Sequence, residues 1–179
     1  MDETGKECIL AWFHNQISGL NKYTALEIGT RRWGSNSTHH KVWFPKAKKI
    51  IMTDFIDGED VDVVADAHQL SKTFGEGAID VIAAASVFEH LKKPWIVAEE
   101  ILKTLKPGGL FFVQTHHTFP VHGYPNDYFR YTTAGLETLF EKASELHSQF
   151  EFPATIKSER LDFTLNPNSW LNVCITGKR

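Results

Sequence analysis

The sequence predicts an α/β fold: a three-layer sandwich with a mostly parallel, Rossmann-like sheet and an antiparallel strand at the C-terminal end. Apolar runs rich in Val, Ile and Phe alternate with helical patterns. Within each apolar run, polar and apolar residues alternate only weakly, as expected for strands of a parallel sheet that is covered on both faces. Two further β candidates close the chain as a hairpin. The predicted strands are residues 23–28, 49–54, 61–66, 78–85, 109–115, 151–158 and 169–177.

Helical periodicity predicts three helices between and around these strands. Ile9, Phe13 and Ile17 recur at helical spacing and predict an amphipathic helix over residues 4–19. A second helix starts near Pro94, and we expect the Pro-Gly-Gly sequence at 107–109 to end it. A third is expected over residues 133–146.

Length and composition favour a single globular domain spanning residues 1–179. The net charge of −3, without a polybasic run, argues against nucleic acid as a partner. Apolar runs fall short of the roughly 20 residues that a membrane span needs. Cys8 and Cys174 are too few for a disulfide framework, so we expect a reduced, cytoplasmic setting.

Polar and small residues follow the predicted parallel strands at the points where they end. In open parallel α/β sheets, ligands bind beyond the carboxyl ends of the strands. A glycine there lets the backbone turn sharply and approach a ligand. The pattern therefore predicts one ligand site built from Glu27, Gly29, Asp54, Asp66, Ser86, Glu89, His90, His116 and His117.

The ligand expected at this edge contains adenine and ribose but no phosphates. Asp54 is placed to accept hydrogen bonds from ribose hydroxyls, and Asp66 with Ala67 is placed to contact an adenine. The turn at residues 29–34 is not G-x-G-x-x-G, so the fingerprint that cradles a pyrophosphate is missing. A tight turn at Gly29 and helix caps at the two aspartates are the structural alternatives.

Five segments together carry a family resemblance: "ALEIGTRRWGS", "IIMTDF", "VDVVADAHQL", "AIDVIAAASVFEHLKKPWIVAEEILKTLKPGGLFFVQT" and "HGYPNDYFRYTTAGLETLF". They resemble the class I S-adenosylmethionine (SAM)-dependent methyltransferases, in particular a bacterial methyltransferase-11-like family with EHL, LKPGG and P-x-D-Y-[WF]-R-[YF]-T patterns. The resemblance covers about residues 23–140. It implies the fold and SAM as cofactor, and it does not identify the methyl acceptor.

The resemblance also implies which residues bind the cofactor. The turn after the first predicted strand would approach the methionine part of SAM, and Asp54 would bind the ribose. Phe55 and the residues that end the third predicted strand would contact the adenine, and Ser86 would lie beneath the cofactor. In the first turn, Arg31 stands where many family members have a second glycine, and we hypothesise that it pairs with the methionine carboxylate. The full implied set is Glu27, Gly29, Thr30, Arg31, Asp54, Phe55, Asp66, Ala67, His68 and Ser86.

Candidate acceptor residues lie in the aromatic and polar segment 115–132. We expect His117 or His122 to act as a base, and Tyr124, Asp127, Tyr128 and Arg130 to contact the acceptor. His116 and His117 are adjacent in a strand, so only one of them should face the cofactor. In the alternative interpretation, Asp127 and Arg130 form a structural latch.

The expected function is transfer of a methyl group from SAM to a small-molecule or carbohydrate-like acceptor. The alternatives are a non-catalytic SAM-binding module and a nucleotide-dependent oxidoreductase. No metal is expected, because no spacing typical of two histidines and one carboxylate stands out among the nine histidines. We expect no nucleic-acid or membrane partner and leave a homodimer open. The N-terminal helix, within residues 1–20, should cover the sheet or the cofactor site.

Overall fold

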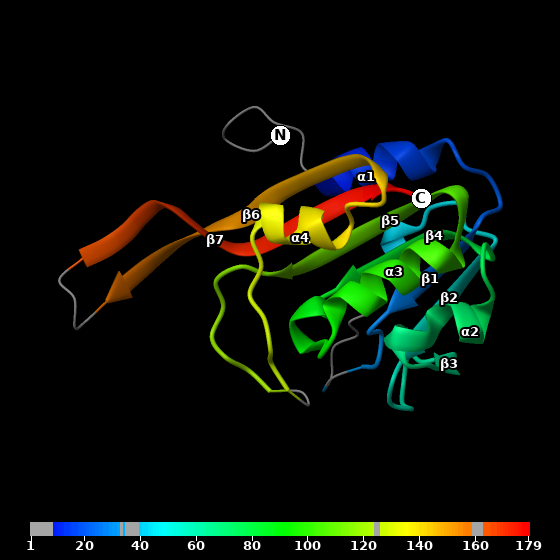
Figure 1. The fold of residues 1–179 in the computed structure, drawn as a ribbon, viewed down its shortest axis with the longest axis horizontal. Coiled ribbons are helices and arrows are strands. Elements are labelled where there is room, and N and C mark those ends of the chain that lie inside the picture. The colour runs from blue at the N-terminus through cyan, green and yellow to red at the C-terminus, as the bar shows by residue number, and fades with distance from the viewer. Residues whose placement is uncertain (1–8, 33, 35–39, 124–125, 159–162) are drawn as a thin grey trace.

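A computed structural model describes residues 9–32, 34, 40–123, 126–158 and 163–179. Seven strands form one sheet in the order β3-β2-β1-β4-β5-β7-β6 (Figure 1). Strands β1 to β5 pair in parallel, whereas β7 runs antiparallel to both β5 and β6. The predicted fold class is confirmed. Within the described residues, no helix is both long enough and apolar enough to cross a membrane.

The strands differ from the predicted ranges mainly at their ends. β3 is shorter than predicted because the flanking carboxylates bond to backbone groups: Asp62 accepts a hydrogen bond from Met52 N (2.9 Å), and Asp66 caps the next turn. β5 starts earlier because Leu105 already pairs with Ile79. The bounds are β1 Thr24–Ile28, β2 Lys49–Asp54, β3 Val63–Val64, β4 Ile79–Ala85, β5 Leu105–His116, β6 Ser144–Ser158 and β7 Phe163–Lys178.

The helices are α1 Ile9–Ser18, α2 Leu70–Phe74, α3 Pro94–Thr104 and α4 Thr133–Leu139, with 3-10 turns η1 Lys41–Trp43, η2 Ala67–Gln69 and η3 Phe88–His90. The predicted helix 133–146 is too long at its C-terminal end. Thr132 caps α4 by accepting a hydrogen bond from Gly135 N, but β6 begins at Ser144 and draws the chain into the sheet.

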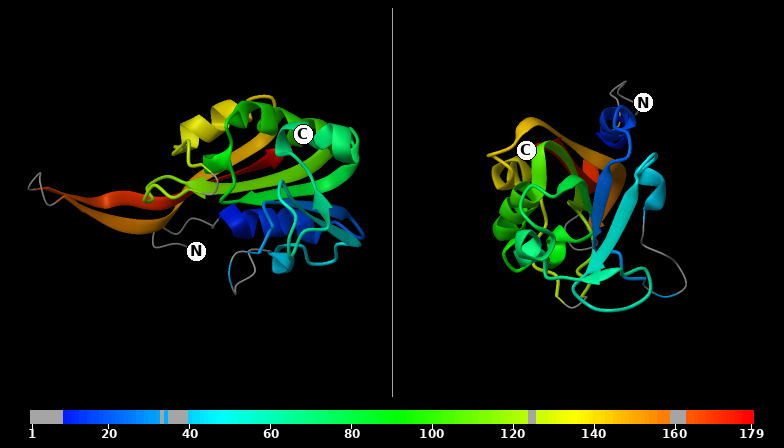
Figure 2. Two further views of the ribbon diagram at one scale, coloured as in Figure 1. Left: turned by 90° about the horizontal axis from the view of Figure 1, so that it is seen from below. Right: turned by 90° about the vertical axis from the view of Figure 1, so that its right-hand side faces the viewer.

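Helices cover both faces of the sheet (Figure 2). On one face α2, α3 and α4 enclose the larger core, which includes Phe88, Phe111 and Phe140. On the other face α1 buries Ile9, Phe13 and Ile17, and the Phe13 ring centroid lies 5.2 Å from that of Phe112. Trp43 and Phe44, at η1, complete this second layer. The two layers fix the strands whose carboxyl ends form the site.

The β6–β7 hairpin extends beyond the rest of the sheet, as a projecting arm (Figure 1). Pairing between β5 and β7 ends at His116 opposite Asn172, whereas β6 and β7 stay paired as far as Ser158 opposite Phe163. Asn172 therefore lies at the point where the arm leaves the sheet, next to the carboxyl end of β5.

Candidate functional site

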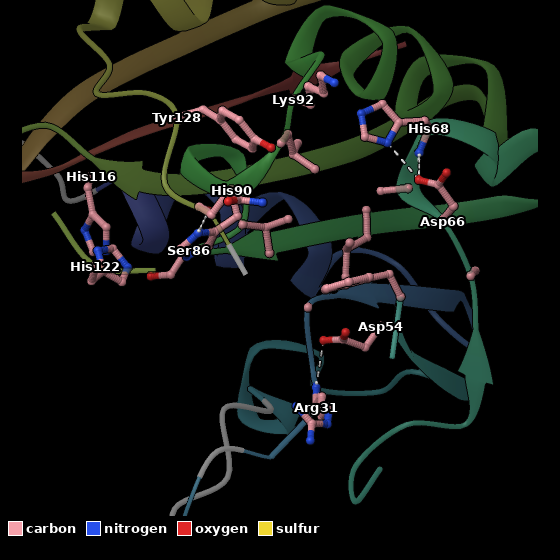
Figure 3. Close-up of a pocket in the computed structure, with 18 of the residues that line it drawn as sticks. Arg31, Asp54, Asp66, His68, Ser86, His90, Lys92, His116, His122 and Tyr128 are labelled. Atoms are coloured by element: carbon pink, nitrogen blue, oxygen red, sulfur yellow. Dashed lines mark hydrogen bonds and ion pairs between the residues drawn. The ribbon is translucent and has the colours of Figure 1, made fainter. Parts of the chain in front are cut away.

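A cavity of about 810 Å³ lies at the carboxyl ends of the parallel strands (Figure 3). Its walls come from the turns after β1, β2, β3 and β4, the end of β5 and the segment that follows β5. This volume is in the upper part of the range of roughly 300–1,000 Å³ found for small-molecule sites. The position is the one that strand-end residues predict for an open α/β sheet.

Gly29 fixes the turn after β1. Its φ of +80° lies in the left-handed region, and a Cβ there would be 2.3 Å from Cγ2 of Val87. Its N–H donates to Thr53 O (2.8 Å), which joins the turn to the end of β2. Only glycine fits this conformation and this close contact. The turn is therefore pressed against the segment that follows β4, at the floor of the cavity.

Asp54 ends β2 with a carboxylate on the cavity wall. Its Oδ2 accepts a hydrogen bond from Arg31 N (3.2 Å), and its Oδ1 accepts one from Ile56 N (3.1 Å). These bonds fix the carboxylate and leave a further acceptor lone pair on each oxygen. Phe55 lines the cavity beside it and is 52% exposed. Asp54 can thus accept hydrogen bonds from two neighbouring hydroxyls, with an aromatic ring close by.

Asp66, Ala67 and His68 form a third part of the wall, after β3. Asp66 Oδ1 accepts hydrogen bonds from His68 N (2.9 Å) and from the His68 ring Nδ1 (2.7 Å). Burial acts to raise the pKa of Asp66, but the hydrogen bonds from His68 outweigh it and the pKa is lowered. The group is therefore a carboxylate at neutral pH.

Ser86 follows β4 with a φ of +53°, an unusual conformation for a residue with a side chain. Its N–H donates to Gln114 O (2.9 Å), which anchors the strained residue to β5. Ser86 is exposed within the cavity. Such strain concentrates at binding and catalytic sites.

A histidine-rich half of the cavity lies at the end of β5. His116 stacks on Phe119 at 4.2 Å, and its ring centroid is 5.1 Å from that of His122. His90 donates from Nδ1 to Asn126 O (2.6 Å) and lies edge-on to His122. Tyr128 lines the same half, and its backbone N–H donates to Glu89 O. Glu89 is fully buried behind these rings.

Most of the predicted cofactor residues come together in the cavity wall. Glu27 and Thr30 do not. Glu27 is buried and accepts hydrogen bonds from His40 N (2.9 Å) and His40 Nδ1 (2.7 Å), while Thr30 Oγ1 donates to Asp60 O. Both hold loops next to the cavity, so their predicted contact with the cofactor has no support from the geometry. The predicted residues that line the cavity are Gly29, Arg31, Asp54, Phe55, Asp66, Ala67, His68 and Ser86.

The structure corrects the choice of His117 as a pocket residue. His117 Nδ1 donates to Tyr131 O (2.7 Å), and the ring packs on Phe150, away from the cavity lining. His116 occupies the cavity wall instead. The two side chains take opposite faces, as expected, but the register of β5 with β7 turns His116 to the cavity. The sequence shows that neighbouring side chains point to opposite faces of the strand, but it does not show which of the two faces the cavity.

The remaining acceptor candidates divide into two groups. His122 and Tyr128 line the cavity, whereas Asp127 and Arg130 form an ion pair beside it, as the latch interpretation predicts. Tyr124 lies outside the described residues. His90, which the sequence predicts at this site, lines the cavity and bonds to Asn126. Phe119 and Asn126 also line the cavity and are not among the predicted residues.

The strand order, the reversed β7 and a ligand cavity at the strand ends define a class I, Rossmann-like methyltransferase fold. Residues 43–113 match the family model described as "Methyltransferase domain". The chain is 40% identical over 37 residues to an "Uncharacterized methyltransferase" of Mycolicibacterium gilvum, a match that covers 21% of this chain and 14% of that relative. The chain thus spans a small part of the curated relative.

Two solved structures share the fold. A SAM-dependent methyltransferase from Archaeoglobus fulgidus superposes with a TM-score of 0.63 at 14% identity, covering 96% of this chain and 93% of its own. The 1,6-didemethyltoxoflavin-N1-methyltransferase of Burkholderia thailandensis, with bound S-adenosylhomocysteine, gives 0.63 at 13% identity, covering 95% and 76%. At these identities the two structures show that the fold is shared.

Proposed function

We propose that this chain transfers the methyl group of SAM to a small-molecule or carbohydrate-like acceptor. The observation that carries the proposal is the division of one cavity into two halves. One half gathers Asp54, Phe55 and Asp66, which suit a nucleoside, and the other gathers His90, His116 and His122, which suit a polar acceptor. A transferase needs both partners in one cavity, with the reacting atoms in line.

The nucleoside half fits SAM better than a dinucleotide. Asp54 has free acceptor positions for ribose hydroxyls, and Phe55 and Ala67 offer apolar surface to an adenine whose amino group can donate to Asp66. Among the described lining residues, Arg31 and Lys92 are the only Arg or Lys side chains, which is few for a pyrophosphate. Arg31 would meet the methionine carboxylate. The oxidoreductase alternative would need a group of basic side chains for a pyrophosphate, and the described lining residues do not supply one.

Bound SAM supplies a methyl group that its own sulfonium charge already activates for displacement. The chain's residues therefore act mainly by alignment. Gly29 and Ser86 bring the turns after β1 and β4 together beneath the cofactor position, and Val87 and Leu91 provide apolar wall that excludes water. His122 Nδ1 is within 3.2 Å of Pro120 O, which leaves Nε2 as the atom able to accept a proton from the acceptor.

Isothermal titration with SAM, S-adenosylhomocysteine and NAD tests the cofactor assignment. We expect the first two to bind and NAD not to bind. Incubation with methyl-labelled SAM and a panel of hydroxyl, amine and sugar acceptors then tests transfer, with labelled product expected for one class. SAM binding without product on any acceptor would favour the non-catalytic module, and binding of NAD in place of SAM would overturn the proposal.

A further inference from the structure

We propose that Glu89, His116 and His122 bind a divalent transition-metal ion at the acceptor end of the cavity. Glu89 comes from η3, His116 from the end of β5 and His122 from the segment after it. One ligand atom from each residue lies within 4.8 Å of the others. Figure 3 shows His116 and His122 together at one side of the cavity. An ion with ligands at 2.0–2.2 Å in tetrahedral geometry holds them roughly 3.3 Å apart, so small rotations of the side chains complete the site.

Hydrogen bonds fix both histidine rings in the form that binds metals. His116 Nδ1 is 3.0 Å from Asn172 Oδ1, and His122 Nδ1 is 3.2 Å from Pro120 O. Carbonyl oxygens only accept hydrogen bonds, so each Nδ1 carries a proton, and in the neutral form of the ring Nε2 is the nitrogen with the lone pair that a metal ion needs. Metal-ligating histidines characteristically donate their other ring N–H to an oxygen in this way.

Asp127 adds a second outer contact to His122. Its Oδ2 lies 3.2 Å from His122 Nδ1 and also accepts a hydrogen bond from His122 N (2.9 Å). Arg130 pairs with the other oxygen of Asp127 and holds the carboxylate in place. Carboxylate–histidine–metal arrangements of this type orient the ring and raise its basicity.

Glu89 provides the independent evidence for a cation. Its side chain is completely buried, and Oε2 accepts a hydrogen bond from Thr115 Oγ1 (2.7 Å). Oε1 has no hydrogen-bond donor among the described residues, although His116 Nε2 is 3.1 Å away and His90 Nε2 is 3.8 Å away. A buried carboxylate oxygen without a hydrogen-bond donor is unfavourable unless a positive charge lies next to it, and an ion held between Glu89 and the two histidines would supply that charge.

The ligand set indicates the class of ion. Two imidazoles and one carboxylate suit Zn²⁺ or Fe²⁺ and leave coordination positions open, whereas Mg²⁺ prefers oxygen ligands. Sequence spacing did not reveal this group because Glu89 lies far from the histidines in the chain, and the strand order brings it to them. The expectation of no metal rested on that spacing alone.

The open positions face the half of the cavity assigned to the acceptor. This step rests on the proposed function. The ion would bind an acceptor hydroxyl and lower its pKa, so that the hydroxyl gives its proton to solvent before attack. His122 Nε2 then holds the ion and no longer serves as the base. The oxygen then forms a bond to the methyl carbon, the carbon–sulfur bond breaks, and its electron pair stays on sulfur. No oxidation state changes. The substrate class is therefore an acceptor with a hydroxyl or a similar oxygen ligand beside the methylated atom.

Metal titration tests the site without any methyl transfer. The full chain is stripped with a chelator, and Zn²⁺ or Mg²⁺ is titrated by calorimetry in the absence of SAM. We expect one equivalent of Zn²⁺ to bind and Mg²⁺ to bind far more weakly. Glu89→Gln and His122→Ala should each weaken Zn²⁺ binding by at least about tenfold. The control His117→Ala, which changes the neighbouring histidine outside the cavity, should bind as the unmodified chain does.

Circular dichroism confirms that each variant is folded. A folded, stripped chain that binds no Zn²⁺ would overturn the proposal and would assign a proton to the Glu89–His116 contact. Equal Zn²⁺ binding in all variants would also overturn it, because the ion would then sit elsewhere. A parallel SAM titration of the unmodified chain separates the two proposals. If that chain binds Zn²⁺ but not SAM, the proposed function is contradicted; if it binds SAM but not Zn²⁺, the metal site is contradicted.

Discussion

Asp127 and Arg130 form a two-pronged ion pair, with Nη1–Oδ1 at 2.5 Å and Nη2–Oδ2 at 2.6 Å. The Asp127 side chain is 2% exposed, and the guanidinium also donates to the carbonyls of Phe119 and Pro120. Arg130 thus joins the start of the segment that carries His122 to its end, and the segment forms a closed loop. This explains how an irregular segment can present a histidine to the cavity at a fixed position.

Replacing Asp127 with asparagine should lower the free energy of unfolding by about 1–3 kcal/mol, because a buried charge-assisted contact is lost. Urea denaturation measures the change. Glu99→Gln is the matched control, since it breaks a surface ion pair with Lys142 and should have little effect. Equal losses in the two variants would contradict the structural role of the Asp127–Arg130 pair.

The same pair predicts an acid-dependent loss of stability. Arg130 lowers the pKa of Asp127 in the folded chain, so the stabilisation is complete above the unfolded-state pKa of about 3.9 and is lost as the pH falls below it. The difference in unfolding free energy between the unmodified chain and Asp127→Asn should be constant from pH 6 to about pH 5 and should narrow as the pH falls to about 3. A difference that stays constant over this range would show that Asp127 is not the titrating group.

Gly29→Ala should destabilise the fold and abolish tight SAM binding. The left-handed conformation costs a residue with a side chain about 1–2 kcal/mol, and the contact with Val87 adds to it because a β-branched side chain cannot rotate freely away. Gly108→Ala is the control. Gly108 has a φ of +76°, and an added Cβ would have nothing within 4 Å, so this variant measures the conformational cost without a steric contact.

Thermal unfolding of both glycine variants separates these effects. Gly29→Ala should unfold at a lower temperature than Gly108→Ala, and combining it with Val87→Ala should recover part of the difference. Identical unfolding temperatures for the two single variants would show that the contact between the turns after β1 and β4 is not as tight as the structure places it.

Asp54→Asn should weaken SAM binding about tenfold, equivalent to about 1.4 kcal/mol, because ribose hydroxyls would donate to a neutral amide oxygen instead of a carboxylate. Asp57→Asn is the control, since Asp57 is exposed and does not line the cavity. Calorimetric titration gives both affinities. A loss of the same size in the control would point to a general effect of charge rather than to a contact with ribose.

The sequence predicts residues at strand ends well and side-chain partnerships poorly. Asp54 and Asp66 line the cavity at its predicted position because parallel strands bring their carboxyl ends to one edge. The choice between His116 and His117 depends on the register with Asn172, a contact distant in sequence. The end of α4 depends on the pairing of β6 with β7, which overrides local helical periodicity. Glu89 meets the histidines only through the strand order.

A crystal structure with S-adenosylhomocysteine tests the central claim, that carboxylates ending successive parallel strands bind a phosphate-free adenosine. We expect both ribose hydroxyls at about 2.6–3.2 Å from Asp54 oxygens. We also expect the adenine ring to lie between Phe55 and Ala67. A nucleoside bound outside this cavity, or ribose hydroxyls out of reach of Asp54, would contradict the assignment of the site and the transferase function built on it.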